Sequence, residues 1–226
     1  MKKLVIFDLD GTLVNTLDDL SDSVNFALSQ SGFPTHSHEK FRYFVGNGIY
    51  KLIERALPEN RRDAETVGLV KSVFMEHYSE HCTGKSLPYP GIDQLLQTLK
   101  NQGIKLAVAS NKVHPATVAI VEHFWGKSYF DLILGHRDGR PTKPDPEIIS
   151  DILTFLDVEK TEVLYAGDSG VDMQTAHNAG VTAIGVTWGL RTREELEENS
   201  ADFIVDSPME IAGLADNGDP TLTGCL

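Results

Sequence analysis

Residues 3 to 13 read Lys-Leu-Val-Ile-Phe-Asp-Leu-Asp-Gly-Thr-Leu, and this stretch decides the fold class. Its first half, Lys3 to Phe7, is a continuous apolar run without helical period, which predicts a buried strand of a parallel sheet. Its second half, Asp8 to Thr12, is rich in turn-forming residues. It predicts a loop at the carboxyl end of that strand.

Strands and helices alternate beyond Pro90, as hydrophobic periodicity and Gly, Pro and capping residues indicate. This alternation predicts an α/β fold with a doubly wound, Rossmann-like parallel sheet. The expected elements are helix 91–102, strand 104–109, helix 115–124, strand 132–134, helix 146–156, strand 163–166, helix 171–179, strand 181–186, a short helix from the capping box of Thr192 and Glu195, strand 203–205, and a helix opened by Ser207 and Pro208.

Three helical patterns in a row interrupt this scheme between the first strand and residue 84. The first begins at Thr16, which with Asp19 resembles a capping pair, and ends at Gly32; the others lie at 49–57 and 69–78. We therefore expect an α/β core formed by residues 1–15 and 84–215 and a helical insertion at 16–83. Residues 216–226 are poor in core-forming side chains and are expected to form a flexible tail.

Composition excludes several classes of function. With 226 residues, 41% of them hydrophobic, the chain can bury a substantial core. A net charge of −13 argues against nucleic acid or an anionic membrane as partner. No apolar stretch approaches the ~20 residues of a membrane-spanning helix. The lack of a secretory-signal pattern and the distant pair Cys82 and Cys225 favour a cytoplasmic location.

Polar side chains follow three of the predicted strands, where an open parallel sheet binds its ligands. Several carboxylates should therefore converge on one edge, and they would repel each other unless a cation neutralised them. Oxygen ligands of this kind suit Mg²⁺, whose usual companion is a phosphoryl group, and a carboxylate can then act as a nucleophile. The converging residues are Asp8, Asp10, Ser110, Asn111, Lys112, Gly167, Asp168, Ser169 and Asp172.

Four segments in this order resemble the motifs of the haloacid dehalogenase superfamily. They are Asp8 to Leu13, Ser110-Asn111, Lys143 to Pro146, and Gly167 to Asp172. Each segment alone could be an ordinary turn or helix cap, but chance does not explain the set. The helical insertion lies where one class of these enzymes carries a cap domain. Asp10 and Thr12 resemble the phosphatase and phosphotransferase branch.

The resemblance implies roles for the core residues. Asp8 would be the nucleophile that forms an aspartyl-phosphate, and Asp10 would be the general acid and then the base. Lys143 would offset the repulsion between Asp8 and phosphate. Phosphate would be bound by Thr12, Ser110 and Asn111, and Mg²⁺ by Asp8, the backbone carbonyl of Asp10, Asp168 and Asp172, the last directly or through water.

The cap sequence is similar to the phosphoglycolate phosphatase group in Phe44 to Ile49 and in Pro88 to Gly91. The resemblance makes 2-phosphoglycolate the first substrate to consider. Gly46 and Asn47 would approach the bound anion, with Arg42, Lys51 or Arg55 pairing its carboxylate. Equally, the glycines on either side of Asn47, Gly46 and Gly48, could simply form a loop between two cap helices. Asn15 stands where relatives usually carry Asp.

Three other functions remain open at this stage. A phosphosugar mutase resembling β-phosphoglucomutase would use the same core, and so would a pyrophosphatase. A non-catalytic phosphate-binding module is disfavoured, because mere binding has no use for the general acid Asp10. We expect a monomer or a homodimer acting on a small phosphorylated metabolite.

Overall fold

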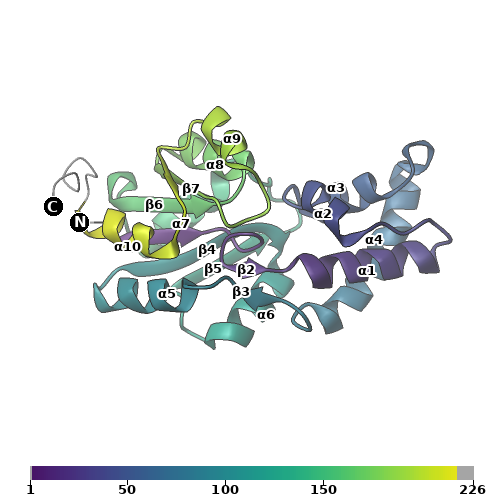
Figure 1. Ribbon diagram of the computed structural model, residues 1–226, viewed down its shortest axis with the longest axis horizontal. Coiled ribbons are helices and arrows are strands. Elements are labelled where there is room, and N and C mark those ends of the chain that lie inside the picture. The colour runs from purple at the N-terminus through teal and green to yellow at the C-terminus, as the bar shows by residue number, and fades with distance from the viewer. Residues whose placement is uncertain (1, 218–226) are drawn as a thin grey trace.

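The computed structural model describes residues 2–217 and shows a six-stranded parallel sheet with helices on both faces (Figure 1). The strand order is β5-β4-β1-β6-β7-β8. The strands are β1 (Leu4–Phe7), β4 (Lys105–Val113), β5 (Leu132–His136), β6 (Val163–Gly167), β7 (Thr182–Val186) and β8 (Phe203–Val205). The predicted doubly wound α/β fold is confirmed.

The two faces of β1 pack into separate cores, because successive side chains point to opposite sides of a strand. Val5 and Phe7 pack with α5 (Ile92–Asn101), α6 (His114–Trp125) and α10 (Pro208–Asn217). Leu4 and Ile6 pack with α7 (Glu147–Leu156), α8 (Gly170–Ala179) and α9 (Arg193–Glu198). These β1 side chains are fully buried, as the unbroken apolar run predicted.

Register brings the strand ends to one edge of the sheet. Phe7 pairs with Val108 of β4 and with Ala166 of β6. The residues that follow these three positions therefore emerge side by side. Strand β4 runs to Val113, past the predicted end at residue 109, so the polar residues 110–112 lie within it. The register places them next to Asp8, after β1, and Asp168, after β6.

Four helices lie beyond this edge, on the right of Figure 1. They are α1 (Leu17–Gln30), α2 (His38–Phe44), α3 (Gly48–Ala56) and α4 (Ala64–His81), with a short 3₁₀ turn at Glu59–Arg61. The chain enters and leaves this group, called the cap helices below, through the antiparallel pair β2 (Val14–Asn15) and β3 (Leu87–Pro88). A second 3₁₀ turn, Lys160–Glu162, comes directly before β6 along the chain.

The structure corrects three local predictions. The capping pair is wrong: Thr16 makes no side-chain cap, because its hydroxyl donates to the Asp10 carboxylate at 2.5 Å. Helix α2 was not predicted, because among its residues only Phe41 is buried and no helical period is visible. Helix α10 continues to Asn217, past the predicted start of the tail. Residues 218–226, including Cys225, lie outside the described part of the chain.

Within residues 2–217, no helix combines the length and the apolar character needed to cross a membrane.

Candidate active site

The site begins with Asp8, the first residue after β1. Asp8 is buried, and Nζ of Lys143 lies 2.9 Å from its Oδ1 as an ion pair without hydrogen-bond geometry. Burial raises the pKa of Asp8 to about 6; Lys143 opposes this shift, whereas the charges of Asp172 and Asp10 add to it. Asp8 is thus a carboxylate held out of water beside a cation.

Lys143 connects strands β4 and β6 and helix α8 through its ammonium group. Nζ donates to the carbonyl of Ala109 at 3.0 Å, to the Tyr165 hydroxyl at 2.8 Å and to Oδ1 of Asp172 at 2.7 Å. Burial lowers the pKa of Lys143, but Asp172 and Asp8 outweigh burial and raise it above its usual value. The residue therefore stays charged and fixed in position.

Three buried carboxylates form a compact cluster. Oxygen atoms of Asp8, Asp168 and Asp172 all lie within 4.8 Å of one another. Burial, together with the charges of Asp172 and Asp8, raises the pKa of Asp168 well above its ordinary value. A Cβ at Gly11, which has φ +90°, would collide with the Asp168 carboxylate, so only glycine lets the first loop approach this acid. The cluster is an oxygen-only site of the kind that binds a hard cation.

Asp172 is already satisfied by neighbouring residues. Its Oδ1 accepts from Lys143 and from the Tyr165 hydroxyl, at 2.7 and 2.8 Å. Its Oδ2 accepts from the hydroxyl and the amide of Ser169, at 2.6 and 3.2 Å. Asp168 by contrast accepts one bond, from the amide of Leu190 at 2.7 Å. The hydrogen bonds leave Asp8 and Asp168 freer than Asp172 to bind a ligand.

Asp10 lies at the boundary with the cap helices. Lys112 Nζ contacts its two carboxylate oxygens at 2.8 and 3.0 Å, and the Thr16 hydroxyl donates to one of them. The Lys112 ammonium also lies 4.9 Å from the ring centre of Tyr78 in α4. The carboxylate of Asp10 is therefore oriented by groups from β4 and from the start of α1.

The predicted phosphate-binding residues occupy different environments. The Thr12 hydroxyl is buried and, among residues 2–217, has no hydrogen-bond partner. Ser110 is buried and accepts a bond from the amide of Lys112 at 3.3 Å. Asn111 bridges three segments, since its side chain donates to the carbonyls of Gly46 and Lys143 and accepts from the amide of Lys143. Within residues 2–217, Thr12 thus offers a hydroxyl that neither donates nor accepts a hydrogen bond, and Ser110 offers one that only accepts.

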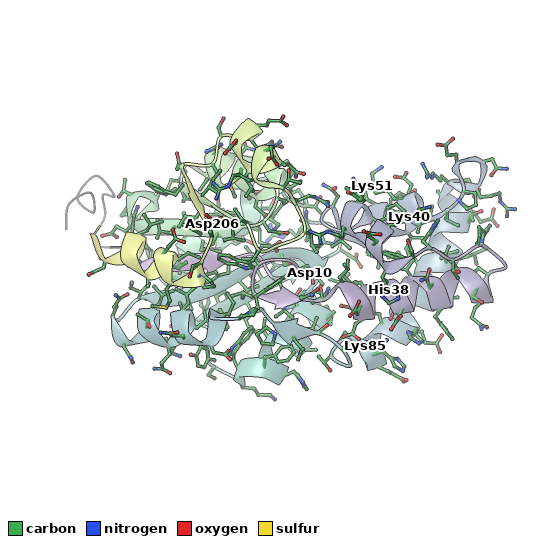
Figure 2. The ribbon with its side chains drawn as sticks, in the orientation of Figure 1. Asp10, His38, Lys40, Lys51, Lys85 and Asp206 are labelled. Atoms are coloured by element: carbon green, nitrogen blue, oxygen red, sulfur yellow. The ribbon has the colours of Figure 1, made fainter. Side chains whose placement is uncertain are left out.

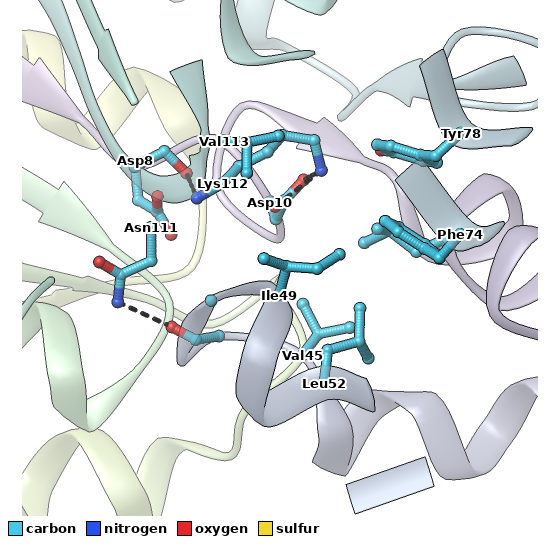
Figure 3. Close-up of a pocket in the computed structure, with 14 residues that line it drawn as sticks. Asp8, Asp10, Val45, Ile49, Leu52, Phe74, Tyr78, Asn111, Lys112 and Val113 are labelled. Carbon is cyan, nitrogen blue, oxygen red and sulfur yellow. Dashed lines mark hydrogen bonds and ion pairs between the residues drawn. The ribbon is translucent and has the colours of Figure 1, made fainter. Parts of the chain in front are cut away.

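A pocket opens between the strand edge and the cap helices, as the close-up in Figure 3 shows. Its polar floor comes from the core and its other wall from α1, α3, α4 and the loop before α3. The lining residues are Asp8, Asp10, Ser110, Asn111, Lys112 and Val113 from the core, and Leu20, Val45, Gly46, Gly48, Ile49, Leu52, Phe74 and Tyr78 from the cap side.

Five residues were predicted to bind the substrate from the cap, and only Gly46 lines this pocket. The other four are Arg42, Asn47, Lys51 and Arg55. Arg42 donates to the carbonyls of Gly189 and Leu190, outside it. Asn47 accepts a bond from Arg55 at 2.7 Å. Lys51 pairs with Glu54 at 2.6 Å and lies well away from Asp10 in Figure 2.

Two residues of the site were given no role by sequence reasoning. Lys112 was placed at the strand edge, and its only signal was its position directly after Ser110 and Asn111. Tyr165 is fully buried inside β6, and the signal was a hydroxyl-bearing residue in a strand that is otherwise apolar. Both contact carboxylates that the sequence did identify.

A doubly wound sheet with a partly neutralised, buried carboxylate cluster and a fixed lysine where its strands end is suited to phosphoryl transfer, because such a site can hold a divalent cation and offset the charge of a phosphate.

Comparison with known proteins specifies this class. A family model described as haloacid dehalogenase-like hydrolase matches residues 5–186. A phosphoglycolate phosphatase of Mesorhizobium japonicum is 34% identical over 199 residues, covering 87% of this chain and 87% of that protein. A phosphoglycolate phosphatase of Aquifex aeolicus is 30% identical over 215 residues, covering 95% and 97%. The crystal structure of a predicted phosphoglycolate phosphatase from Haemophilus somnus has a TM-score of 0.85 at 30% identity, covering 94% of this chain and 97% of that chain.

The chain belongs to the haloacid dehalogenase-like hydrolase family. Within that family it is a phosphatase, in agreement with the branch that Asp10 and Thr12 indicated.

Proposed function

We propose that this phosphatase is Mg²⁺-dependent and hydrolyses a small phosphorylated metabolite through an aspartyl-phosphate on Asp8. One observation carries the proposal: Asp8 stands buried at a strand end, 2.9 Å from the Lys143 ammonium and beside two further carboxylates. Such a group is shielded from water, oriented by a cation and able to attack phosphorus.

The donor set fits Mg²⁺. Asp8 and Asp168 offer carboxylate oxygens at a place where burial, with neighbouring carboxylates adding to it, raises their pKa values, so a bound cation would favour their charged forms. Both oxygens of Asp172 are already hydrogen-bonded, so this residue would orient the site indirectly, through its bonds to Lys143 and Ser169. When bound, the ion would neutralise charge on the phosphate and on these carboxylates.

The chain's own residues account for the chemical steps. An Asp8 oxygen forms a bond to phosphorus while the ester oxygen leaves, and Asp10 gives that oxygen a proton. Asp10 then takes a proton from water as the water attacks the phosphorylated Asp8, which releases inorganic phosphate and restores the carboxylate. Lys143 stabilises the negative charge near Asp8, and the free hydroxyl of Thr12 can donate to a phosphoryl oxygen.

The names of the relatives make 2-phosphoglycolate the first substrate to test. This compound carries a carboxylate besides its phosphate, so it needs a second positive contact in the pocket.

Phosphate release from a panel of phosphoglycolate, phosphosugars, nucleotides and pyrophosphate tests the proposal. We expect turnover with Mg²⁺, no turnover after chelation, and a transient mass increase of one phosphoryl group on a peptide containing Asp8. Asp8→Asn should abolish turnover, whereas Asp138→Asn, an exposed acid, should leave it unchanged. Full activity of Asp8→Asn would refute the mechanism, and sugar-phosphate isomerisation without phosphate release would identify a mutase.

A further inference from the structure

The side of the pocket that faces the reacting edge is lined mainly by apolar side chains, with the buried hydroxyl of Tyr78 as the polar side-chain group among the described residues. Figure 3 shows Val45, Ile49 and Leu52 around α3, and Phe74 and Tyr78 on α4, directed toward Asp10 and Lys112. Leu20 of α1 completes this surface, called the apolar wall below. The group that phosphate is attached to must lie against the apolar wall when phosphate is at Asp8.

The apolar wall contains no cationic side chain within residues 2–217. Lys112, the only cation among the lining residues, already contacts the two oxygens of Asp10. Lys143 pairs with Asp8 and Asp172, outside the lining. A second anion on the substrate would therefore be buried without a counter-charge, which is strongly unfavourable.

The arginines of the cap are engaged elsewhere. Arg42 donates to carbonyls of the loop before α9, and Arg191 in that loop donates to the carbonyls of Arg42 and Val45. Arg55 donates to the carbonyls of Tyr43 and Phe44 and to Asn47. These guanidinium groups hold the cap helices to one another and to the core, and none lines the pocket.

We propose that this enzyme selects phosphate monoesters with an apolar, uncharged leaving group and discriminates against esters that carry a second anion, such as 2-phosphoglycolate. The inference rests on the proposed phosphatase function and concerns the substrate of the same site. The apolar wall supplies affinity by removing hydrocarbon from water, while Lys112, Lys143 and the carboxylate cluster remain for phosphate and for the reaction.

Matched substrates provide the first test. Ethyl phosphate and butyl phosphate have leaving groups of closely similar basicity, so a difference between them reports binding of two methylene groups. Burying each methylene contributes about a fourfold preference, so kcat/KM should be about fifteenfold higher for butyl phosphate. It should also exceed kcat/KM for 2-phosphoglycolate.

A charge placed on the apolar wall provides the second test. Ile49→Arg should lower the ratio of kcat/KM for butyl phosphate to that for 2-phosphoglycolate by at least about tenfold, since one paired charge replaces apolar contact. The matched control is Tyr50→Arg, which adds the same charge to the exposed side of α3 and should leave the ratio unchanged. Because both esters are measured on the same preparation, partial unfolding of a variant cancels from the ratio.

The outcomes separate the two proposals. A wild-type preference for 2-phosphoglycolate, with turnover that needs Mg²⁺ and Asp8, would overturn the apolar selectivity and leave the phosphatase mechanism intact. An unchanged ratio in Ile49→Arg would also overturn it. Failure to hydrolyse any ester in the presence of Mg²⁺ would refute both.

Discussion

Asp8 is a residue whose environment works against its charge. Its pKa rises from an ordinary 3.8 to about 6, mainly because it is buried. Folding therefore favours the protonated acid, and the folded chain binds more protons than the unfolded chain between these two values. The free energy of unfolding must then fall as pH rises through this interval.

We expect this effect to be visible in the metal-free protein. Asp8 should remove about 2 kcal/mol of stability between pH 4 and pH 6, because the group is already partly ionised in the unfolded chain at pH 4 and only half ionised in the folded chain at pH 6. Urea unfolding with a chelator present, at both pH values, measures it. Asp8→Asn should show a correspondingly flatter dependence on pH, and equal slopes in the two proteins would contradict the assignment.

Lys143 is the matching residue of opposite charge. Lys143→Ala would leave the carboxylates of Asp8 and Asp172 facing each other in a buried site without their cation. Breaking such a pair typically costs about 3–5 kcal/mol. We expect a loss of stability of this size in urea unfolding, together with loss of turnover. Lys160→Ala, at an exposed position, serves as the control and should do neither.

At the scale of elements, α1 is fixed to the returning chain by one buried acid. Asp19 accepts from the amides of Lys85 and Ser86, and also from the Ser86 hydroxyl at 2.6 Å. These bonds fasten the first cap helix to the segment that leads back into the core. Asp19 is thus not the helix cap that its sequence position suggested. It forms a brace, that is, a set of hydrogen bonds between α1, where the chain enters the cap, and residues 85–86, where the chain leaves it.

Asp19→Asn should weaken this brace, because an amide offers one acceptor oxygen where the carboxylate offers two. We expect a loss of about 1–3 kcal/mol in the free energy of unfolding, the cost of leaving buried donors unpaired. Chemical denaturation checks it. Asp18→Asn, one residue earlier and exposed, is the control and should change stability by less than about 0.5 kcal/mol. A similar loss in both variants would mean that the brace is not the cause.

At the scale of the whole molecule, the pocket exists only while the cap helices lie against the core. Arg191 donates across this boundary to the carbonyl of Val45 at 2.7 Å and to that of Arg42. Arg42 returns the contact to the carbonyls of Gly189 and Leu190. This reciprocal set of bonds ties the cap helices to the loop before α9.

Arg191→Met should keep the aliphatic stem but release the boundary. If the free energy that favours the closed arrangement of cap and core falls by about 1.4 kcal/mol, the complete pocket is populated less often and KM should rise about tenfold. Steady-state kinetics with the best ester measures it. Arg193→Met removes an exposed arginine that pairs with Asp206, and KM should then be unchanged. An unaltered KM in Arg191→Met would show that the closed arrangement does not depend on the hydrogen bonds of Arg191.

The sequence predicted the fold and the polar edge well, for a physical reason. Buried parallel strands are continuous apolar runs, and the residues directly after each run must appear at the same edge once the strands are in register. Asp8 and Asp168 could therefore be placed without coordinates, whereas Lys143 was assigned to the site only through the resemblance to the haloacid dehalogenase motifs. Lys112 was placed at the strand ends but was given no role. Its partner Asp10 is distant in sequence, and the two residues meet only because β4 pairs with β1.

The cap was harder to read because the same residue type can bind a ligand or hold the fold. Arg42, Lys51 and Asn47 have the chemistry of anion binding, yet their partners are carbonyls, Glu54 and Arg55. The partners of Arg42 lie far along the chain, in the loop before α9, whereas Glu54 and Arg55 are residues of α3 itself. Nothing in the local sequence distinguishes these contacts from ligand binding. Helix α2 was missed for a related reason, since its one buried side chain, Phe41, sets no period.

The β2–β3 pair has a consequence for how such enzymes diversify. Val14 lies opposite Pro88 and Asn15 opposite Leu87, so the chain leaves the sheet and comes back to it at neighbouring points. The whole segment between them can be exchanged for another of different length without moving a strand. Replacement of this one segment can therefore change the substrate specificity of such an enzyme while the catalytic residues of the α/β core stay in place.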